Sequence, residues 1–226
     1  MQYENVKMGR FQSRPNRFVA LVLMDGETVT CHVKNTGRCR ELFVKDAKVV
    51  LAKGTNPARK TSYDVIAVHK GDKLVNIDSQ APNRVFREWA ENGGFLPGIK
   101  LIRPEHAYGR SRLDFYVEAD DKHCLVEVKG VTLEEEGHAL FPDAPTLRGT
   151  KHLRELKAAI HEGFECYVVF VIQMRGVQCF SPNEATDPAF AKMLKEAADA
   201  GVHVLAHDCL VTEDTMAIGD PVTVFV

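Results

Sequence analysis

Hydrophobic and polar residues alternate with two different periods along this chain, which predicts two structural parts. In the first eighty residues, apolar runs are short and separated by turn residues, with no helix-period stretch between them; they cover 18–24, 28–33, 48–52, 63–68 and 74–77. Asp25 and Gly26 separate the first two runs, and glycine accepts the positive φ of a tight hairpin turn. The pattern predicts five short strands in a small β-barrel.

Beyond residue 80 the pattern mixes helix and strand periods. Amphipathic helices are predicted over 83–91, after an N-cap at Thr146 or Thr150, and over 188–200. Apolar strands are predicted over 99–102, 166–172, 177–180 and 202–206. The unbroken apolar run 166–172 is typical of a central strand covered by helices on both faces. The predicted fold class is therefore α/β (α+β), with a barrel domain over 1–80 and a second domain with a mixed sheet flanked by helices over 81–226.

Three charged residues of the second part form a pattern that suggests phosphodiester chemistry. Side chains alternate across a strand, so Glu127 and Lys129 share one face, and a hairpin with the strand around Asp114 would bring two carboxylates and an ammonium together. Oxygen ligands of this kind suit a hard divalent cation, and the lysine could orient a water or stabilise negative charge. The alternative is a solvated strand face with an ion pair. Apolar neighbours of both carboxylates favour a site.

The spacing of these residues resembles the PD-(D/E)xK nuclease superfamily. That resemblance implies Asp114 and Glu127 as ligands of Mg2+ or Mn2+, with Lys129 as the catalytic lysine. We expect the Val128 carbonyl to complete the metal site, since the peptide between two same-face side chains can turn its oxygen toward them. An upstream glutamate joins the cluster in some of these nucleases, and Glu105 is the candidate here. The alternative for Glu105 is a loop residue paired with Arg103 or Arg110.

Longer runs carry a more specific resemblance. The segments NTGR at 35–38, EL at 41–42, YGRSRLDF at 108–115, EVKGVT at 127–132 and FPDAPTLRGTKHLREL at 141–156 resemble the sugar fermentation stimulation protein A family. The resemblance implies an N-terminal OB-fold joined to a nuclease-like domain, in a DNA-binding protein linked to regulation of sugar, chiefly maltose, metabolism. One departure is that Val33 and Lys34 stand where the family commonly has Cys-Pro.

Charge is distributed unevenly along the chain. Residues 1–80 hold fourteen Lys and Arg against eight Asp and Glu, a balance of +6, whereas residues 81–226 hold fifteen against twenty-three, a balance of −8. A basic barrel fits nucleic-acid binding, because phosphate contacts supply most sequence-independent affinity; surface scatter is the alternative. The candidate nucleic-acid-binding residues in the barrel are Arg14, Arg17, Asn35, Arg38, Arg40, Arg59 and Lys60. Interleaved aromatic residues could stack on bases: Phe11, Phe18, Phe43 and Tyr63.

The second part adds fewer candidates for nucleic-acid contacts. They are Arg110 and Arg112 beside Asp114, and Arg148 and Lys151 at the start of the second predicted helix, whose free N–H groups could receive a phosphate. His152 and Lys157 are expected to face other directions. The acidic run 134–138 is expected to be a solvated loop.

Composition excludes several protein classes and leaves two functions. No apolar run approaches membrane-spanning length and the N-terminus does not resemble a signal peptide, so we expect a soluble, cytoplasmic protein with no membrane partner. Six scattered cysteines support neither a zinc knuckle nor a disulfide framework. One function is a DNA-binding regulator with a nuclease-like scaffold, acting on single- or double-stranded DNA without sequence specificity. The other is an active Mg2+- or Mn2+-dependent nuclease that hydrolyses DNA or RNA. A sugar binder, which the family name suggests, finds no supporting constellation, and the sequence leaves the oligomeric state open.

Overall fold

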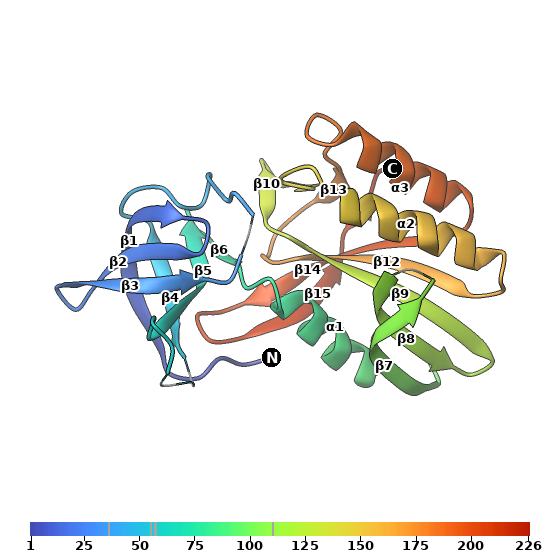
Figure 1. Cartoon of the computed structure of the whole chain (residues 1–226), viewed down its shortest axis with the longest axis horizontal. Helices are drawn as coiled ribbons and strands as arrows, with labels where there is room; N and C mark the ends of the chain where they lie inside the picture. Colours follow the sequence, from blue (N-terminus) through green and yellow to red (C-terminus); the bar gives the residue numbers. More distant parts are fainter. Residues whose placement is uncertain (36, 55, 57, 110) are drawn as a thin grey trace.

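The computed structural model describes residues 1–35, 37–54, 56, 58–109 and 111–226, which form a β-barrel beside a larger sheet with helices on both faces (Figure 1). The barrel sheet contains β1 (Val6–Asn16), β2 (Val19–Met24), β3 (Glu27–Val33), β4 (Lys48–Lys53), β5 (Tyr63–Lys70) and β6 (Lys73–Asn76). β1 pairs with both β2 and β4, and β3 returns to pair with β5, so that five strands close into a ring. This confirms the predicted OB-like barrel.

The five strands of the ring are not the five that the apolar runs predict. The sequence pattern missed β1, because more than half of its residues are polar. Two register shifts, between Phe11 and Ser13 and between Ser13 and Asn16, also interrupt the alternation of its side chains. Arg10 and Arg14 therefore lie within a barrel strand instead of in a loop before it. The run at 74–77 forms β6, which extends the sheet from β5 outside the ring.

The second part is built on a six-stranded mixed sheet. Its strands are β7 (Ile99–Tyr108), β8 (Ser111–Ala119), β9 (Lys122–Val131), β12 (Glu165–Ile172), β14 (His203–Val211) and β15 (Met216–Pro221), in the order β15-β14-β12-β9-β8-β7. β12 is central and runs parallel to both neighbours, whereas the outer pairs are antiparallel. The prediction of a buried central strand is confirmed.

Helices cover both faces of this sheet, as the unbroken burial along β12 requires. Val169 and Val171 pack in one cluster with α1 (Ala81–Glu91), and Val168 and Phe170 pack in another with α2 (Leu147–Ile160) and α3 (Pro188–Asp199). α1 lies below the sheet and the other two helices above it in Figure 1. Among the described residues, no helix combines the length and apolarity needed to cross a membrane.

A small four-stranded sheet lies between the barrel and α2. It contains β10 (Leu133–Glu135), β11 (His138–Phe141), β13 (Cys179–Pro182) and β16 (Thr223–Val224). The expectation of a solvated loop over 134–138 is wrong for Glu134, which lies on β10 and is only 4% exposed. Its carboxylate accepts hydrogen bonds from the ammonium groups of Lys70 and Lys73 of the barrel and from the Gly137 N–H. A buried acidic residue thus ties the two parts together.

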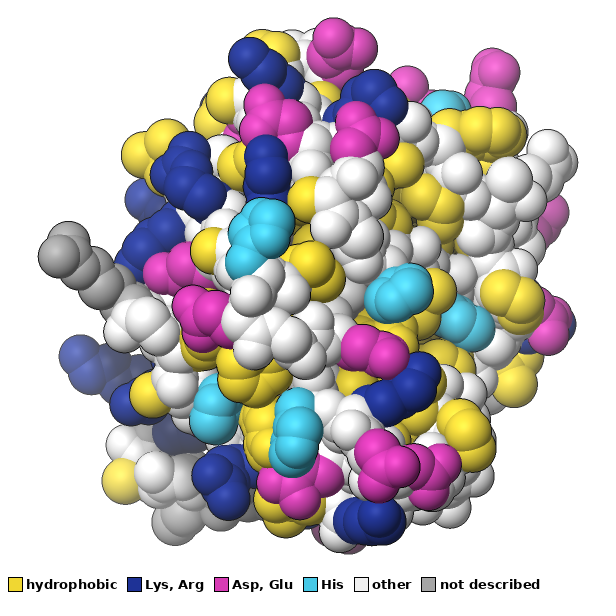
Figure 2. Space-filling view, turned by 90° about the vertical axis from the view of Figure 1, so that its right-hand side faces the viewer, with side chains coloured by type: hydrophobic (Ala, Val, Ile, Leu, Met, Phe, Trp, Pro, Cys, Tyr) yellow, Lys and Arg dark blue, Asp and Glu magenta, His cyan; other side chains and the backbone are white. Residues whose placement is uncertain are grey.

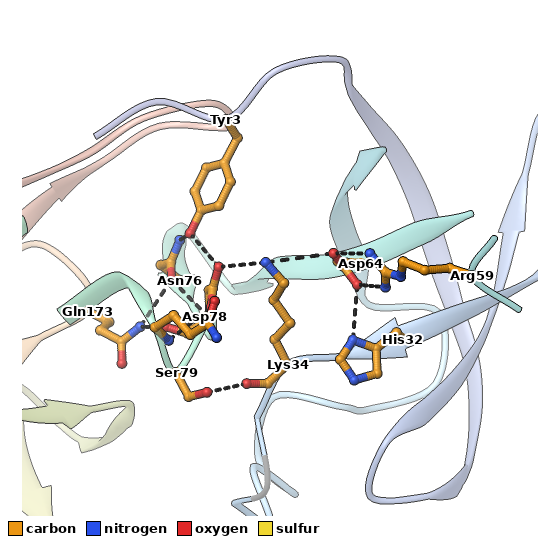
Figure 3. A network of polar contacts seen from close by, with 10 residues as sticks. Tyr3, His32, Lys34, Arg59, Asp64, Asn76, Asp78, Ser79 and Gln173 are labelled. Atoms are coloured by element: carbon orange, nitrogen blue, oxygen red, sulfur yellow. Dashed lines mark hydrogen bonds and ion pairs between the residues drawn. The ribbon is translucent and has the colours of Figure 1, made fainter. Parts of the chain in front are cut away.

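A polar network also joins the barrel to the second part (Figure 3). The Gln173 side chain, just after β12, donates to Asn76 Oδ1 at 3.0 Å and to the Asp78 carbonyl at 3.1 Å. The Asp78 carboxylate, which is fully buried, accepts from Tyr3 Oη and Lys34 Nζ, each at 3.3 Å. The network holds the barrel in a fixed position against the end of the central strand.

Lys34 extends this network into the barrel. Its ammonium also lies 3.7 Å from the carboxylate of Asp64, which is buried and bound by His32 and Arg59 (Figure 3). One lysine therefore neutralises parts of two buried carboxylates.

Candidate catalytic and nucleic-acid-binding site

Asp114 lies where the hairpin of β8 and β9 opens. The ladder between the two strands runs from Ala119 opposite Lys122 to Phe115 opposite Val126, which confirms the predicted hairpin. Beyond that pair, Asp114 Oδ2 accepts the Val128 N–H at 2.8 Å. Asn83 Nδ2 of α1 donates to the other carboxylate oxygen, also at 2.8 Å. The carboxylate is thus fixed by the strand that carries Glu127 and by a helix.

Glu127 is held from two sides and is only 2% exposed. Its Oε1 accepts from Lys129 Nζ on the same strand face and contacts His152 Nδ1 of α2. Its Oε2 is buried and has no hydrogen-bond partner among the described residues. Leaving a buried carboxylate oxygen unpaired costs free energy, so this atom marks a place where a ligand would be bound favourably.

The pKa values of the two carboxyl groups shift in opposite directions because their partners differ. Burial, together with the nearby charge of Glu127, raises the pKa of Asp114, although hydrogen bonds from Val128 and Asn83 oppose the shift. Burial also acts to raise the pKa of Glu127, but the hydrogen bond with His152 and the charge of Lys129 outweigh it and lower that pKa. Glu127 is therefore the more readily ionised of the pair, and a cation would favour the ionised form of both.

The donor set fits one divalent cation held by oxygen ligands. Asp114 and Glu127 supply carboxylate oxygens on adjacent strands. Glu127 Oε2 is free of protein hydrogen bonds among the described residues, so it could bind the cation directly. The described residues contain no group of three or more His, Cys, Asp and Glu side chains placed to hold a metal, so a cation here would take its remaining ligands from backbone and water. A role for the Val128 carbonyl stays a prediction.

Glu105 stands opposite Asp114 in the register of β7 and β8, but its side chain is engaged elsewhere. Its side chain is 66% exposed and lies 3.8 Å from the guanidinium of Arg112, on a backbone with φ of 54°. This is a surface ion pair, as the alternative expected, but its partner is Arg112 and Glu105 lies on β7 and not in a loop. A metal-binding role for Glu105 finds no support in the contacts of its side chain.

Two residues of the site were missed by the sequence analysis. His152 was expected to face away, yet it is 3% exposed and contacts Glu127, because α2 turns its buried face toward β9. His152 directly precedes Leu153, which belongs to the apolar stripe of the helix. This position in the sequence could have indicated that His152 is buried. Asn83 carries no comparable signal, since only tertiary packing brings α1 against β8.

Basic residues surround a depression at the N-terminal end of α2. Its volume is about 360 Å3, and it is lined by Ser111, Arg112, Leu147, Arg148, Lys151 and His152. His152 links this depression to Glu127. The structure therefore brings three of the predicted nucleic-acid contacts, Arg112, Arg148 and Lys151, to the edge of the candidate metal site. Arg110, the fourth, lies outside the described residues.

A second basic groove, of about 650 Å3, lies on the barrel. It is lined by Arg14, Asn16, Arg17, Gly37, Arg38, Arg40, Phe43 and Ala144. Arg17, Arg38 and Arg40 are exposed, and the Arg17 guanidinium lies over the ring of Phe18, which is 48% exposed. Of the four proposed stacking residues, Phe11 is instead buried in the core. Ala144 precedes α2 by three residues, so the barrel groove adjoins the depression at the helix start.

Arg14 and Asn35 shape this groove from within. The Arg14 guanidinium donates to the carbonyls of Arg17, Asn35, Gly37 and Arg38 over distances of 2.7–3.2 Å. Asn35 Oδ1 accepts the Gly37 N–H at 2.7 Å. These side chains hold the backbone on both sides of Arg38, and nucleic-acid contacts by Arg14 and Asn35 stay a prediction.

Arg59 and Lys60 do not line the groove. Both Nη atoms of Arg59 bind the Asp64 carboxylate, and Lys60 is exposed on the adjoining loop. Nucleic-acid contacts by these two residues stay a prediction.

Comparisons with known proteins agree over nearly the whole chain. Residues 13–77 match the SfsA N-terminal OB domain, and residues 80–215 match the sugar fermentation stimulation protein RE domain. A sugar fermentation stimulation protein homolog from Desulfitobacterium hafniense is 55% identical over 99% of this chain and 98% of its own, and one from Clostridium beijerinckii is 52% identical over 99% of each. The solved structure of Pyrococcus furiosus SfsA, described as a complex with Ca2+, matches with a TM-score of 0.91 at 28% identity, covering 100% of this chain and 98% of that one.

Proposed function

From the premise that the chain belongs to the sugar fermentation stimulation protein family, we propose that it binds DNA and carries a divalent-cation site competent for phosphodiester hydrolysis. In this proposal residues 1–80 form the domain that binds the nucleic acid, and residues 81–226 form the domain that binds Mg2+ or Mn2+. The Pyrococcus furiosus relative, described with bound Ca2+, supports a divalent cation in this fold.

The observation that carries the proposal is the buried, unpaired Oε2 of Glu127 beside Asp114 and Lys129. Buried polar atoms usually have a hydrogen-bond partner, and here the atom without one lies beside a second carboxylate and an ammonium. A bound divalent cation would satisfy this atom, and it would supply a water of lowered pKa and charge neutralisation at a phosphate. Asp114 and Glu127 would be its protein side-chain ligands.

Three neighbouring residues position the carboxylates and place a positive charge beside them. The Lys129 side chain is 14% exposed and its ammonium lies against Glu127, so a positive charge stands beside the carboxylates where negative charge would develop on a phosphoryl group. His152 fixes the Glu127 carboxylate from the side of α2, and Asn83 fixes Asp114. We assign positioning roles to both.

The two basic surfaces give the nucleic acid a path to this centre. Arg17, Arg38 and Arg40 lie on the barrel, and Arg112, Arg148 and Lys151 lie at the start of α2, with Ala144 at the border between the groups. The N-terminal end of α2 faces the barrel (Figure 1). Phosphates bound along this path would reach the cation site, which supports binding through the backbone without sequence specificity.

The second candidate is a DNA-binding regulator that does not cleave. The specific observation in its favour is that the cation site offers two carboxylates, while Glu105 is engaged with Arg112 at the surface. The family name links such a protein to sugar metabolism, and its proposed role in this case is regulation of sugar, chiefly maltose, metabolism.

One experiment separates the two candidates. The full-length protein is incubated with labelled single- and double-stranded DNA and with RNA, in Mg2+, Mn2+ or EDTA, and binding and cleavage are scored separately. Cleavage that needs the cation and disappears in Asp114→Asn supports hydrolysis. Binding without cleavage under every condition supports the regulator, and absence of binding to all three nucleic acids refutes both.

The cation site has its own test, which is independent of turnover. Mg2+ or Mn2+ should raise the melting temperature of the wild-type protein, because a ligand that binds only the folded state stabilises it by mass action. Asp114→Asn keeps an acceptor for the Val128 N–H and should lose most of that rise. Glu105→Gln is the matched control on the neighbouring strand and should retain it. Equal shifts in wild type and Asp114→Asn would contradict the site.

A further inference from the structure

A row of aromatic rings crosses the outer strands of the large sheet at the end of the molecule opposite the barrel. His106 of β7 stacks on Tyr116 of β8 with ring centroids 4.8 Å apart, and Tyr116 faces His123 of β9 at 6.1 Å with an angle of only 16° between the rings. The Arg103 guanidinium lies 5.8 Å from the centre of the Tyr116 ring. Three flat rings and a flat cation thus form one stacked row.

This row lines a pocket of about 450 Å3. Its other walls are Glu118 of β8 and the residues Glu162, Gly163 and Phe164 that follow α2. That volume falls within the range of small-ligand sites. Figure 2 shows this end of the molecule, where histidine side chains gather with acidic and basic side chains beside them.

The ring at the centre of the row is held in place by hydrogen bonds. Tyr116 Oη lies 2.8 Å from Glu118 Oε1 and 2.6 Å from His123 Nδ1. Burial, helped by the charge of Arg103, lowers the pKa of His106, which favours an uncharged imidazole that can stack like an aromatic ring. Binding of a ligand that stacks here would lose little free energy to the ordering of side chains, because the rings are already fixed.

The pocket lies on the strand that carries Asp114. Tyr116 follows Asp114 by two residues along β8, and two strand residues span about 7 Å. α2 connects the same two places, since His152 near its start contacts Glu127 and Phe164 just beyond its end lines the pocket. The aromatic row therefore lies beyond the cation site on the side away from the barrel.

The charges of the pocket select the part of a nucleic acid that fits. Glu118 and Glu162 oppose one guanidinium, that of Arg103, so the pocket disfavours a phosphate. Carboxylates accept hydrogen bonds from the exocyclic amino groups of adenine, cytosine and guanine, which thymine and uracil lack. Stacking on aromatic rings tolerates every base, and the two acidic side chains add a preference for amino-bearing ones.

We propose that this pocket binds one unpaired base of a nucleic-acid strand that crosses the cation site, with the base stacked on the His106–Tyr116–His123 row and its amino group directed to Glu118 or Glu162. The proposal rests on the proposed function, because it needs a bound strand. It specifies the substrate class as nucleic acid that is single-stranded on the side of the cation site away from the barrel.

The test uses the full-length protein and short single-stranded DNA containing one fluorescent adenine analogue whose emission stacking quenches. The analogue is placed at successive positions in otherwise identical strands, and EDTA prevents cleavage. We expect quenching at a restricted set of positions in the wild type. His106→Ala should remove it and weaken binding about fivefold or more, since stacking of one base contributes about 1–3 kcal/mol.

A matched control exists on the opposite face of the sheet. His203 of β14 stacks on Tyr167 at 4.7 Å with an angle of 23°, so His203→Ala removes the same kind of ring from the same kind of pair. It should change neither quenching nor affinity. Melting temperatures of both variants show whether each is folded, and Tyr116→Phe, which keeps the ring, should retain quenching.

The outcomes separate this proposal from the one on which it rests. Strand binding in the wild type without quenching, or equal loss in both histidine variants, overturns the base pocket and leaves DNA binding intact. No binding of any strand overturns both. Quenching of the free nucleoside analogue but not of the strand would show a mononucleoside pocket and would also overturn the proposal. Glu118→Gln should reduce the preference for adenine over thymine at the quenched position.

Discussion

The buried carboxylate of Glu134 allows a quantitative prediction about how the two parts of the chain hold together. Hydrogen bonds from Lys73 and Lys70 and from the Gly137 N–H outweigh the opposing effect of burial and lower the pKa of Glu134 from 4.5 to about 2. Each pKa unit corresponds to about 1.4 kcal/mol. The shift amounts to roughly 3 kcal/mol of stability, which we reduce to about 2–3 kcal/mol because both lysines are about a third exposed and partly screened by water.

The sign follows from the direction of the shift. A carboxyl group whose pKa is depressed by folding stabilises the folded state above its unfolded pKa, and this contribution is lost as the pH falls toward the folded pKa. Glu134→Gln keeps an oxygen for the Gly137 N–H and removes the charge. At pH 7 the variant should be about 2–3 kcal/mol less stable than the wild type, and the difference should shrink as the pH falls from about 4.5 to about 2.

Urea unfolding of both proteins across this pH range measures the effect. Glu135→Gln is the control, since Glu135 is the exposed neighbour on the same strand and should change stability by less than about 0.5 kcal/mol. A difference between wild type and Glu134→Gln that stays constant with pH would refute the electrostatic explanation. An equal loss in Glu135→Gln would refute the role assigned to burial.

Three further variants test other parts of the structure. Lys129→Ala should abolish cleavage and leave DNA affinity nearly unchanged; if the lysine only neutralises the carboxylates, the melting temperature without metal should fall instead and Mn2+ should restore it. Arg38→Ala should reduce the slope of log affinity against log salt by about 0.9 on duplex or 0.7 on single-stranded DNA in an anisotropy series, and an unchanged slope would remove it from the phosphate contacts. Lys34→Met should lower the unfolding free energy in urea by at least about 2 kcal/mol, because the buried Asp78 and Asp64 lose their shared ammonium, and a neutral effect would mean that other donors suffice.

Local patterns predicted the parts of the fold that depend on local physics. The alternation around Glu127 and Lys129 placed both on one face of β9, and the unbroken apolar run 166–172 identified the central strand. The Thr146 cap, whose side chain accepts the Gly149 N–H, was one of the two predicted starts of α2. Each of these features follows from a period or a cap that a few neighbouring residues determine.

Features that depend on distant segments escaped prediction. β1 pairs through its backbone with β2 and β4 and buries only Phe11, so its sequence lacks the apolar alternation that identifies a strand. Glu134 was assigned to solvent because three glutamates stand in a row, yet the lysines that bury it are more than sixty residues away. The same reason applies to Asn83, whose partner Asp114 lies on another element. No local period records such contacts.

The four carbonyls gathered by Arg14 have a consequence for the thermodynamics of DNA binding. In the proposed DNA complex, the backbone at residues 35, 37 and 38 would lose little conformational entropy when Arg38 meets a phosphate, because Arg14 already holds it in the free protein. Lysine carries the same charge, but its single ammonium has three donors and cannot span four acceptors. Calorimetry on Arg14→Lys should therefore show a nearly unchanged binding enthalpy with a larger entropic penalty, the signature of a surface that must be assembled each time it is used.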